Sequence, residues 1–266
     1  MQFRNTPAGR VLIFIYGIAA YALFLVAITF AIGFTGNFIV PKSIDSGAQG
    51  SLATSLLINA GLLSLFVIQH TVMARPAFKE RWTRIIPQPI ERSTFVAVTS
   101  LLLLFIFKMW QPLTLEIWRV DQPVFQNLIW MLFFAGWLLV PYASILIDHL
   151  DLFGLRQVWQ HLRGRGQQRT GFVVPWLYRI IRNPLMLGFI IAFWSTPVMT
   201  LGHLQFAAMT TGYIFFGVWI EERDLARTLG DDYRAYRKRT PMLIPAIGNS
   251  KAKRPVESDP VRRAFG

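Results

Sequence analysis

Six long apolar segments constrain the fold of this chain more than any other feature of its sequence. An α-helix needs about 20 apolar residues to cross the roughly 30 Å hydrocarbon core of a bilayer. The first segment carries no charged residue and is longer than the apolar part of a signal peptide, so we expect it to be retained as a span. The predicted spans are residues 11–34, 52–74, 94–110, 125–147, 184–200 and 203–220.

The composition agrees with this interpretation. Of 266 residues, 53% are hydrophobic and only 15% are charged, which is typical of an all-α polytopic membrane protein and not of a soluble domain. The third segment is the shortest, and we expect Trp110 and Trp118 to extend it at a membrane interface. Only Leu201 and Gly202 separate the last two segments, which predicts a tight helical hairpin.

Lysine and arginine residues predict the orientation of the spans. Residues 35–51 carry only Lys42, and residues 108–124 carry only Lys108 and Arg119. The N-terminal segment carries Arg4 and Arg10, residues 75–93 carry five basic residues, residues 148–183 carry six arginines, and the tail beyond residue 220 carries eleven basic residues. Because positive loops face the cytoplasm, both termini are expected there, which agrees with an even number of spans.

The chain divides into three predicted regions. Residues 1–147 form a four-span membrane region, residues 148–245 form a cofactor-binding region, and residues 246–266 form a disordered basic tail. Within the second region, the glycine-rich stretch 162–171 is expected to be a mobile loop. Residues 221–240 space their apolar side chains as an amphipathic helix does, with a weak point at Gly230.

Composition also excludes several classes of function. The chain has no cysteine and four scattered histidines, so we expect no disulfide, no cysteine nucleophile and no metal site. Its net charge of +13 suits the anionic surface of membrane lipid, and no nucleic-acid-binding motif accompanies that charge. The expected partners are therefore membrane lipid and no nucleic acid, and the sequence leaves the oligomeric state open.

Polar pairs stand at the predicted cytoplasmic ends of four spans. Ionisable groups against apolar spans are costly, so they indicate function unless a local reason explains them. A histidine that ends a helix, or a glutamate that favours a helix N-terminus, would be such a reason. If the topology is right, all four pairs lie at one membrane level and converge on one site: Gln69–His70, Glu91–Arg92, Asp148–His149 and Glu221–Glu222.

Glu221 and Glu222 have the weakest local explanation, because the end of a helix disfavours negative charge. Carboxylates can accept the hydroxyl groups of a ribose. The opposite end of the hairpin begins with Arg182, Asn183 and Pro184, where a helix N-terminus can hold an anion. We expect Asn183 to cap this helix and Pro184 to occupy its first turn. The two ends could hold one cofactor that contains a nucleoside.

The motifs that carry these residues resemble a known family. "YRIIRNPLMLG" (178–188) and "EERDLARTLGDDYRAYRKRTPMLIP" (221–245) resemble the C-terminal signature of isoprenylcysteine carboxyl methyltransferase-like membrane enzymes. "QHTVMARPAFK" (69–79), "IERSTFV" (90–96) and "DHLDLFGLRQVW" (148–159) resemble the nurim-like branch of that family. Asn183 departs from the pattern, because many members have histidine there.

The resemblance implies methyl transfer from S-adenosylmethionine to a small thiol, methanethiol, which would give dimethyl sulfide. The site would be embedded in a bacterial inner membrane and would face the cytoplasm. The positions that the resemblance implies for the cofactor are Tyr178, Arg182, Asn183, Pro184, Met186, Gly188, Glu221 and Glu222.

The acceptor sulfur must lose its proton before or during the transfer. His149, His70 and Glu91 are candidates for the base, and Arg92 is a candidate for stabilising a thiolate. We favour His149, because histidine titrates near neutrality and Asp148 precedes it. Adjacent residues on a helix do not face each other, so the sequence predicts no ion pair between them.

Other interpretations of the function stay open at this point. The same scaffold could methylate a lipid, a prenylated cysteine or an amine, because the sequence does not reveal the size of a pocket. A non-catalytic nurim-like membrane protein is a further alternative. So is an NADPH-dependent enzyme, since sterol reductases resemble this scaffold.

Overall fold

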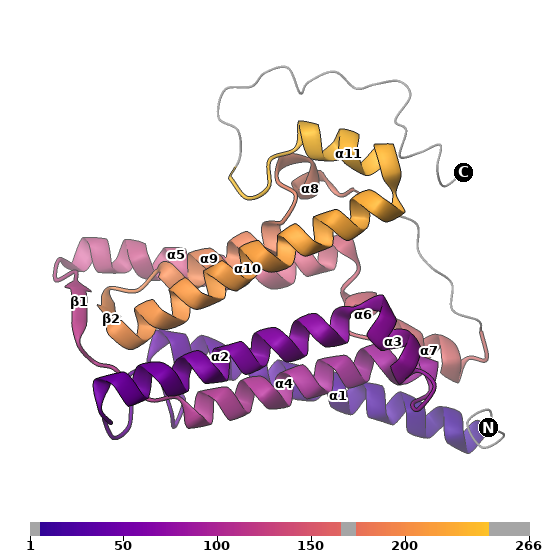
Figure 1. The fold of residues 1–266 in the computed structure, drawn as a ribbon, viewed down its shortest axis with the longest axis horizontal. Coiled ribbons are helices and arrows are strands. Elements are labelled where there is room, and N and C mark those ends of the chain that lie inside the picture. Colours follow the sequence, from indigo (N-terminus) through magenta and orange to yellow (C-terminus); the bar gives the residue numbers. More distant parts are fainter. Residues whose placement is uncertain (1–5, 166–173, 245–266) are drawn as a thin grey trace.

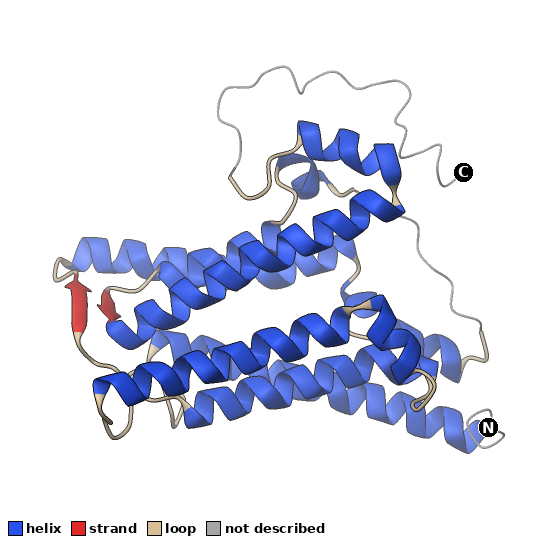
Figure 2. Ribbon diagram, in the orientation of Figure 1, coloured by secondary structure: helices blue, strands red, loops and turns tan. Residues whose placement is uncertain are grey.

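The computed structural model describes residues 6–165 and 174–244. The predicted tail 246–266 and most of the predicted loop 162–171 lie outside these residues. Figure 2 shows that helices dominate the fold. In chain order the elements are α1 (Pro7–Gly36), α2 (Leu52–Ala74), α3 (Pro76–Trp82), a 3-10 helix (Gln88–Ile90), α4 (Glu91–Met109), β1 (Glu116–Arg119), α5 (Pro123–Ile147), α6 (His149–Leu152), α7 (Leu155–Leu162), α8 (Trp176–Ile180), α9 (Pro184–Trp194), β2 (Val198–Thr200), α10 (Leu201–Thr228) and α11 (Gly230–Arg239).

The long helices form two groups that run along the same axis (Figure 1). Helices α1, α2 and α4 pack together in one group, and α5, α9 and α10 pack together in the other. Contacts between α2 and α10 join the groups. The short helices α3, α6 and α7 lie at the end of the molecule opposite the strands, and α8 and α11 lie above α9 and α10 in the view of Figure 1.

Among the described residues, four helices are long and apolar enough to cross a membrane: α1, α2, α4 with its preceding 3-10 turn, and α5. The predicted segment 52–74 coincides with α2, because Ser51 caps its first turn and Arg75 precedes the helix-starting Pro76. Helix α5 spans the predicted segment despite an internal Pro141. The chain is therefore an all-α membrane protein with two short strands.

The predicted hairpin of 184–200 and 203–220 is wrong in its details. Helix α9 has 11 residues, which at about 1.5 Å per residue gives about 16 Å. It ends before Pro197, which has no backbone N–H for a helical bond. Residues 198–200 then pair with β1 as an antiparallel strand, and Thr200 caps α10 by accepting from the His203 backbone N–H. Leu201 and Gly202 belong to α10 and do not form the connection.

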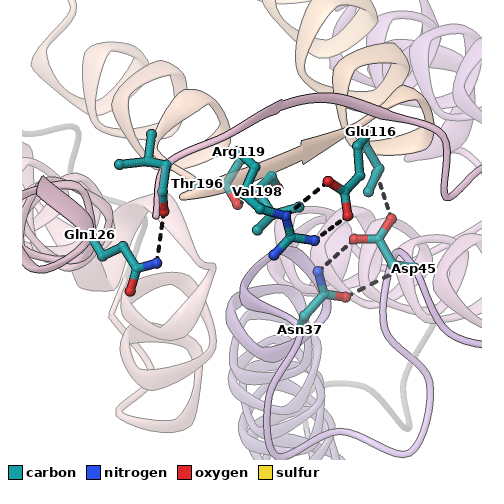
Figure 3. A network of polar contacts seen from close by, with 9 residues as sticks. Asn37, Asp45, Glu116, Arg119, Gln126, Thr196 and Val198 are labelled. Atoms are coloured by element: carbon teal, nitrogen blue, oxygen red, sulfur yellow. Dashed lines mark hydrogen bonds and ion pairs between the residues drawn. The ribbon is translucent and has the colours of Figure 1, made fainter. Parts of the chain in front are cut away.

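A network of polar contacts fastens the loops at the strand end (Figure 3). One carboxylate oxygen of Asp45 accepts from Asn37 Nδ2 at 2.7 Å, and the other accepts from the Thr200 hydroxyl at 2.5 Å. Glu116 and Arg119 form an exposed ion pair beside them. These contacts link the α1–α2 loop and β1 to the start of α10 at the end of the molecule opposite α11.

Buried polar groups join the two helix groups near the same end. Asn59 is fully buried; its Nδ2 donates to the Gln111 carbonyl at 2.8 Å, and its Oδ1 accepts from the Gln111 N–H at 2.9 Å. Gln205 of α10 donates to the Leu56 carbonyl of α2 at 2.8 Å. Trp110 was expected at a membrane interface, but it is only 1% exposed and packs in the core against Phe34 and Phe206.

The predicted single helix over 221–240 is two helices. Residues 221–228 continue α10, and the chain then turns at Gly230, whose φ of +61° favours glycine. Helix α11 follows at once, and Tyr233 is its buried residue. The turn therefore folds α11 back near α8, as Figure 1 shows.

Candidate functional site

An ion pair between Arg182 and Glu222 lies at the centre of the C-terminal half. Arg182 Nη2 and Nε each lie 2.7 Å from the same carboxylate oxygen of Glu222, and the two side chains are only 10% and 12% exposed. The second oxygen of Glu222 is not used by this ion pair. The structure thus joins Arg182, just before α9, to Glu222 in the C-terminal part of α10, as the sequence predicted for the two ends of one site.

Arg182 also holds the tail in place. Its Nη1 donates to the Arg237 carbonyl at 2.9 Å and to the Thr240 carbonyl. The backbone N–H groups of Arg182 and Asn183 donate to the carbonyls of Pro241 and Met242. All three guanidinium nitrogens thus donate within the protein, so the geometry favours Arg182 as a residue that positions Glu222 and the tail. We call Arg182, Glu222 and these tail carbonyls the Arg182 clamp.

The N-terminus of α9 lies directly beside the clamp. Pro184 occupies the first helical turn, as predicted. The prediction that Asn183 caps the helix is wrong: its side chain makes no cap, and its Nδ2 faces the Met242 carbonyl at 3.4 Å. The tail competes for the amide that would have capped the helix. The first-turn N–H groups therefore have no side-chain cap and can serve an anion.

The other two positions expected on α9 have different surroundings. Met186 is half-buried in the first turns of the helix. Gly188 is buried where α9 crosses α5, and a Cβ placed on it would lie 2.8 Å from the Gly136 carbonyl oxygen. The absence of a side chain at Gly188 thus permits this close crossing. A direct role for Gly188 with a cofactor stays a prediction.

Tyrosines surround the clamp on its tail side. The Tyr236 hydroxyl donates to the Tyr178 carbonyl at 2.6 Å, and the Tyr178 hydroxyl faces the Ala143 carbonyl at 3.4 Å. Burial raises the pKa of Tyr236 to about 12, with Arg182 opposing and Glu222 adding to the effect. Burial, with Tyr236 and Glu221, also raises the pKa of Tyr178. Both phenols are therefore neutral hydrogen-bond donors at neutral pH.

His149 belongs to a separate hydrogen-bonded chain between α1, α5 and α6. Its Nδ1 lies 2.8 Å from the Ser144 oxygen, and its Nε2 lies 2.8 Å from the Tyr21 hydroxyl. Because the Ser144 hydroxyl already donates to the Pro141 carbonyl, it accepts from His149 Nδ1–H, and Nε2 accepts from Tyr21. Burial lowers the pKa of His149, which agrees with a neutral ring.

Asp148 does not pair with His149. Its carboxylate forms an ion pair with Arg156 and accepts from the Asp151 N–H at 3.1 Å. The sequence prediction that these neighbours do not face each other is consistent with this placement.

His70 lies among aromatic rings contributed by three helices. Its ring centroid is 5.2 Å from Phe66 of α2, 4.9 Å from Phe95 of α4 and 6.2 Å from Tyr213 of α10. Its Nδ1 is buried without a hydrogen-bond partner in the part of the chain that the structure describes. We call Phe66, His70, Phe95 and Tyr213 the aromatic box.

Glu91 and Arg92 connect the aromatic box to its surroundings. Glu91 lies 3.8 Å from Lys79 of α3, and Arg92 Nε donates to the Leu152 carbonyl at 3.0 Å. The charge of Arg92 acts on both the His70 ring and the Glu221 carboxylate. Arg92 is therefore within electrostatic range of both His70 in the aromatic box and Glu221 at the end of α10.

The structure brings the predicted residues into two neighbourhoods. Arg75 at the end of α2 pairs with Asp224 of α10 at 2.7 Å, two residues after Glu222. This ion pair joins the end of α2, the helix that carries His70, to the part of α10 that carries the acid pair. Within residues 6–165 and 174–244, the hydrogen bonds and ring contacts of His149 go to Tyr21, Ser144 and Phe153, and none of these residues belongs to α10.

Several residues of these two neighbourhoods were not predicted from the sequence as site residues. Tyr21, Ser144, Phe66, Phe95 and Tyr213 all lie within predicted spans, where an aromatic or hydroxyl side chain gives no signal by itself. A helical projection of residues 66–70 could have found one pair, because Phe66 and His70 are four residues apart and share a face. The others meet only through tertiary packing.

Known proteins resemble this chain over most of its length. Methanethiol S-methyltransferase 1 of Bradyrhizobium diazoefficiens is 50% identical over 232 residues, which cover 87% of this chain and 81% of the relative. Methanethiol S-methyltransferase of Mycobacterium tuberculosis is 46% identical over 236 residues, covering 89% and 97%. Nurim of Bos taurus is 28% identical over 187 residues, covering 66% and 70%. No family model and no solved structure matches the chain.

Proposed function

Because the chain belongs to the methanethiol S-methyltransferase family, which is related to nurim, we propose that it transfers a methyl group from S-adenosylmethionine to methanethiol, giving dimethyl sulfide. The observation that carries this proposal is the identity of 40–50% over most of the chain to relatives of that name. A lipid, amine or prenylated acceptor has no comparable support.

The residues around the Arg182 clamp fit the proposed cofactor. Glu221 is exposed, and Glu222 has one oxygen outside its ion pair, so two carboxylates can accept ribose hydroxyls. The uncapped first turn of α9 suits the carboxylate of the amino-acid part. When bound, S-adenosylmethionine supplies a methyl group on a positively charged sulfur. Residues 148–245 would thus form the cofactor-binding region.

The chain's own residues would orient the cofactor and exclude water. Arg182 holds the Glu222 carboxylate and the tail, so the acceptors are fixed before anything binds. Holding the binding groups in the correct orientation before the reaction lowers the barrier of a transfer between two molecules. Tyr178, Pro184 and Met186 line the same end of α9 and α8, which supports their proposed place beside the cofactor.

A proton acceptor near the acceptor sulfur completes the proposal. His149 and His70 are the two histidines of this end of the molecule that were predicted for the role. In His149 both ring nitrogens are already hydrogen-bonded, whereas in His70 a buried Nδ1 lacks a partner among the described residues. Glu91 and Arg92 would act on that acceptor through charge.

We further propose that α9 and α10 complete a six-segment membrane region with both termini in the cytoplasm of a bacterial inner membrane. Arginine-rich segments near α3, α7 and α11 lie toward one end of the fold, which supports one cytoplasmic face. A fluorescent protein fused to the C-terminus should fluoresce in the bacterial host, and an alkaline phosphatase fused there should be inactive. The reverse pair of results would contradict the orientation.

The activity itself is tested with purified protein in detergent, S-adenosylmethionine and methanethiol. Dimethyl sulfide in the headspace should exceed a control without enzyme. Glu222→Gln should lower the rate at least tenfold, because the neutral amide no longer pairs with Arg182. Glu116→Gln, at the exposed ion pair of the opposite end, should leave the rate unchanged. No product from a wild-type protein that stays folded would contradict the proposal.

A further inference from the structure

We propose that the aromatic box is the subsite for the acceptor thiol and that His70 Nδ1 receives the thiol proton. This inference rests on the proposed methyl transfer and goes beyond it, because it names where the acceptor binds and which residues select it. The competing location is the hydrogen-bonded chain around His149.

The shape and chemistry of the aromatic box suit a small apolar thiol. Phe66 and His70 stack at 5.2 Å, and Tyr213 meets Phe66 edge-on at 5.8 Å. All four rings are only partly buried, so the box is not sealed by its own packing. Sulfur makes favourable contacts with aromatic rings. Rings from α2, α4 and α10 would therefore hold a thiol and exclude water.

The polar atoms beside the box suit the proton transfer. His70 Nδ1 is a buried acceptor or donor with no described partner, which is costly unless a ligand completes it. In the step, the thiol S–H bond breaks and its proton passes to Nδ1. The sulfur lone pair forms a bond to the donor's methyl carbon as the donor's own C–S bond breaks, leaving a neutral thioether on each side.

The box also lies on the correct side of the proposed cofactor site. Arg92 acts electrostatically on both His70 and Glu221, and the Arg75–Asp224 ion pair ties the end of α2 to α10. The rings around His149 belong to other elements: Tyr21, Phe24 and Phe153 pack around it on α1 and α6–α7. In His149 both nitrogens are also already engaged.

The test compares two half-buried phenylalanines, one in each location. Phe95→Ala enlarges the aromatic box, and Phe24→Ala enlarges the surroundings of His149. The readout is the ratio of kcat/KM for 1-propanethiol to that for methanethiol, with the Kd for S-adenosylmethionine and the melting temperature measured on the same samples. Added methylenes are discriminated by about tenfold or more in such pockets. We expect the ratio to rise at least tenfold in Phe95→Ala and to stay unchanged in Phe24→Ala, with the cofactor Kd unchanged in both.

A second pair of variants tests the proton acceptor. His70→Gln should lower kcat for methanethiol at least tenfold with the Kd for S-adenosylmethionine unchanged, whereas His149→Gln should have a smaller effect on kcat. If Phe95→Ala does not fold, Phe95→Leu and Tyr213→Leu provide smaller changes with the same expected direction. A preference that changes only in Phe24→Ala, or in neither location, overturns this inference alone. A folded wild type that makes no dimethyl sulfide overturns the proposed function and this inference with it.

Discussion

Replacing Arg182 by alanine is expected to lower the free energy of unfolding by about 3–5 kcal/mol. The substitution leaves the Glu222 carboxylate buried without its cation and removes the donors to the Arg237 and Thr240 carbonyls. Removing one partner of a buried pair costs this much because the remaining charge is not solvated. Denaturant titration of the protein in detergent micelles, followed by far-UV circular dichroism, measures the change.

The same substitution should weaken binding of S-adenosylmethionine at least tenfold, or about 1.4 kcal/mol. Titration calorimetry at a temperature where both proteins are folded separates this effect from unfolding. Arg119→Ala is the matched control, since its ion pair with Glu116 is exposed to solvent and contributes little to stability. Arg182→Lys keeps the charge but loses the fork that reaches both Glu222 and the tail, so it should fall between the two. An Arg182→Ala protein as stable as the wild type would contradict the stabilising role of the Arg182 clamp.

The second large effect is expected at the crossing of α5 and α9. A Cβ at Gly136 would lie 2.6 Å from the Ala192 nitrogen and 2.8 Å from the Gly188 carbonyl oxygen. Backbone atoms of a packed helix cannot move aside cheaply, so Gly136→Ala should destabilise the protein by about 1–3 kcal/mol. It should also weaken cofactor binding, because α9 carries the Asn183–Pro184 turn at its start.

Gly212→Ala is the control for this prediction. Gly212 is also a helical glycine, but no described atom lies within 4 Å of a Cβ placed there. Its substitution should change stability little or raise it by up to about 1 kcal/mol, through helix propensity. Equal losses of stability in the two variants, measured by the same denaturant titration, would show that the close crossing is not the cause.

The sequence predicted the continuous apolar helices well and the irregular connections badly. Residues 52–74 are predominantly apolar, with a serine before them and an Arg-Pro after them, so propensity, capping and hydropathy all agree on α2. The segment 184–200 is equally apolar, yet its helix ends at Trp194. The pairing of residues 198–200 with β1, more than 75 residues earlier, is a tertiary contact that hydropathy does not encode.

The candidate site shows the same division. The meeting of Arg182 and Glu222 was predictable, because a resemblance in ordered motifs placed both near one end of neighbouring helices. The prediction that Asn183 caps α9 was wrong because Pro241 and Met242 accept hydrogen bonds from Arg182 and Asn183. These partners are 59 positions apart in the sequence, and no local pattern predicts their contact. The contacts of His149 with Tyr21 and of His70 with Tyr213 likewise arise from packing between helices distant in sequence.

Transfer of an isotopically labelled methyl group tests the central claim most directly. Purified protein is incubated with S-adenosylmethionine deuterated in its methyl group and with unlabelled methanethiol, and the headspace is analysed by mass spectrometry. We expect dimethyl sulfide in which one methyl group carries the label, in amounts that fall with Glu222→Gln and not with Glu116→Gln. Unlabelled dimethyl sulfide, or none from a folded wild-type protein, would contradict the proposed reaction.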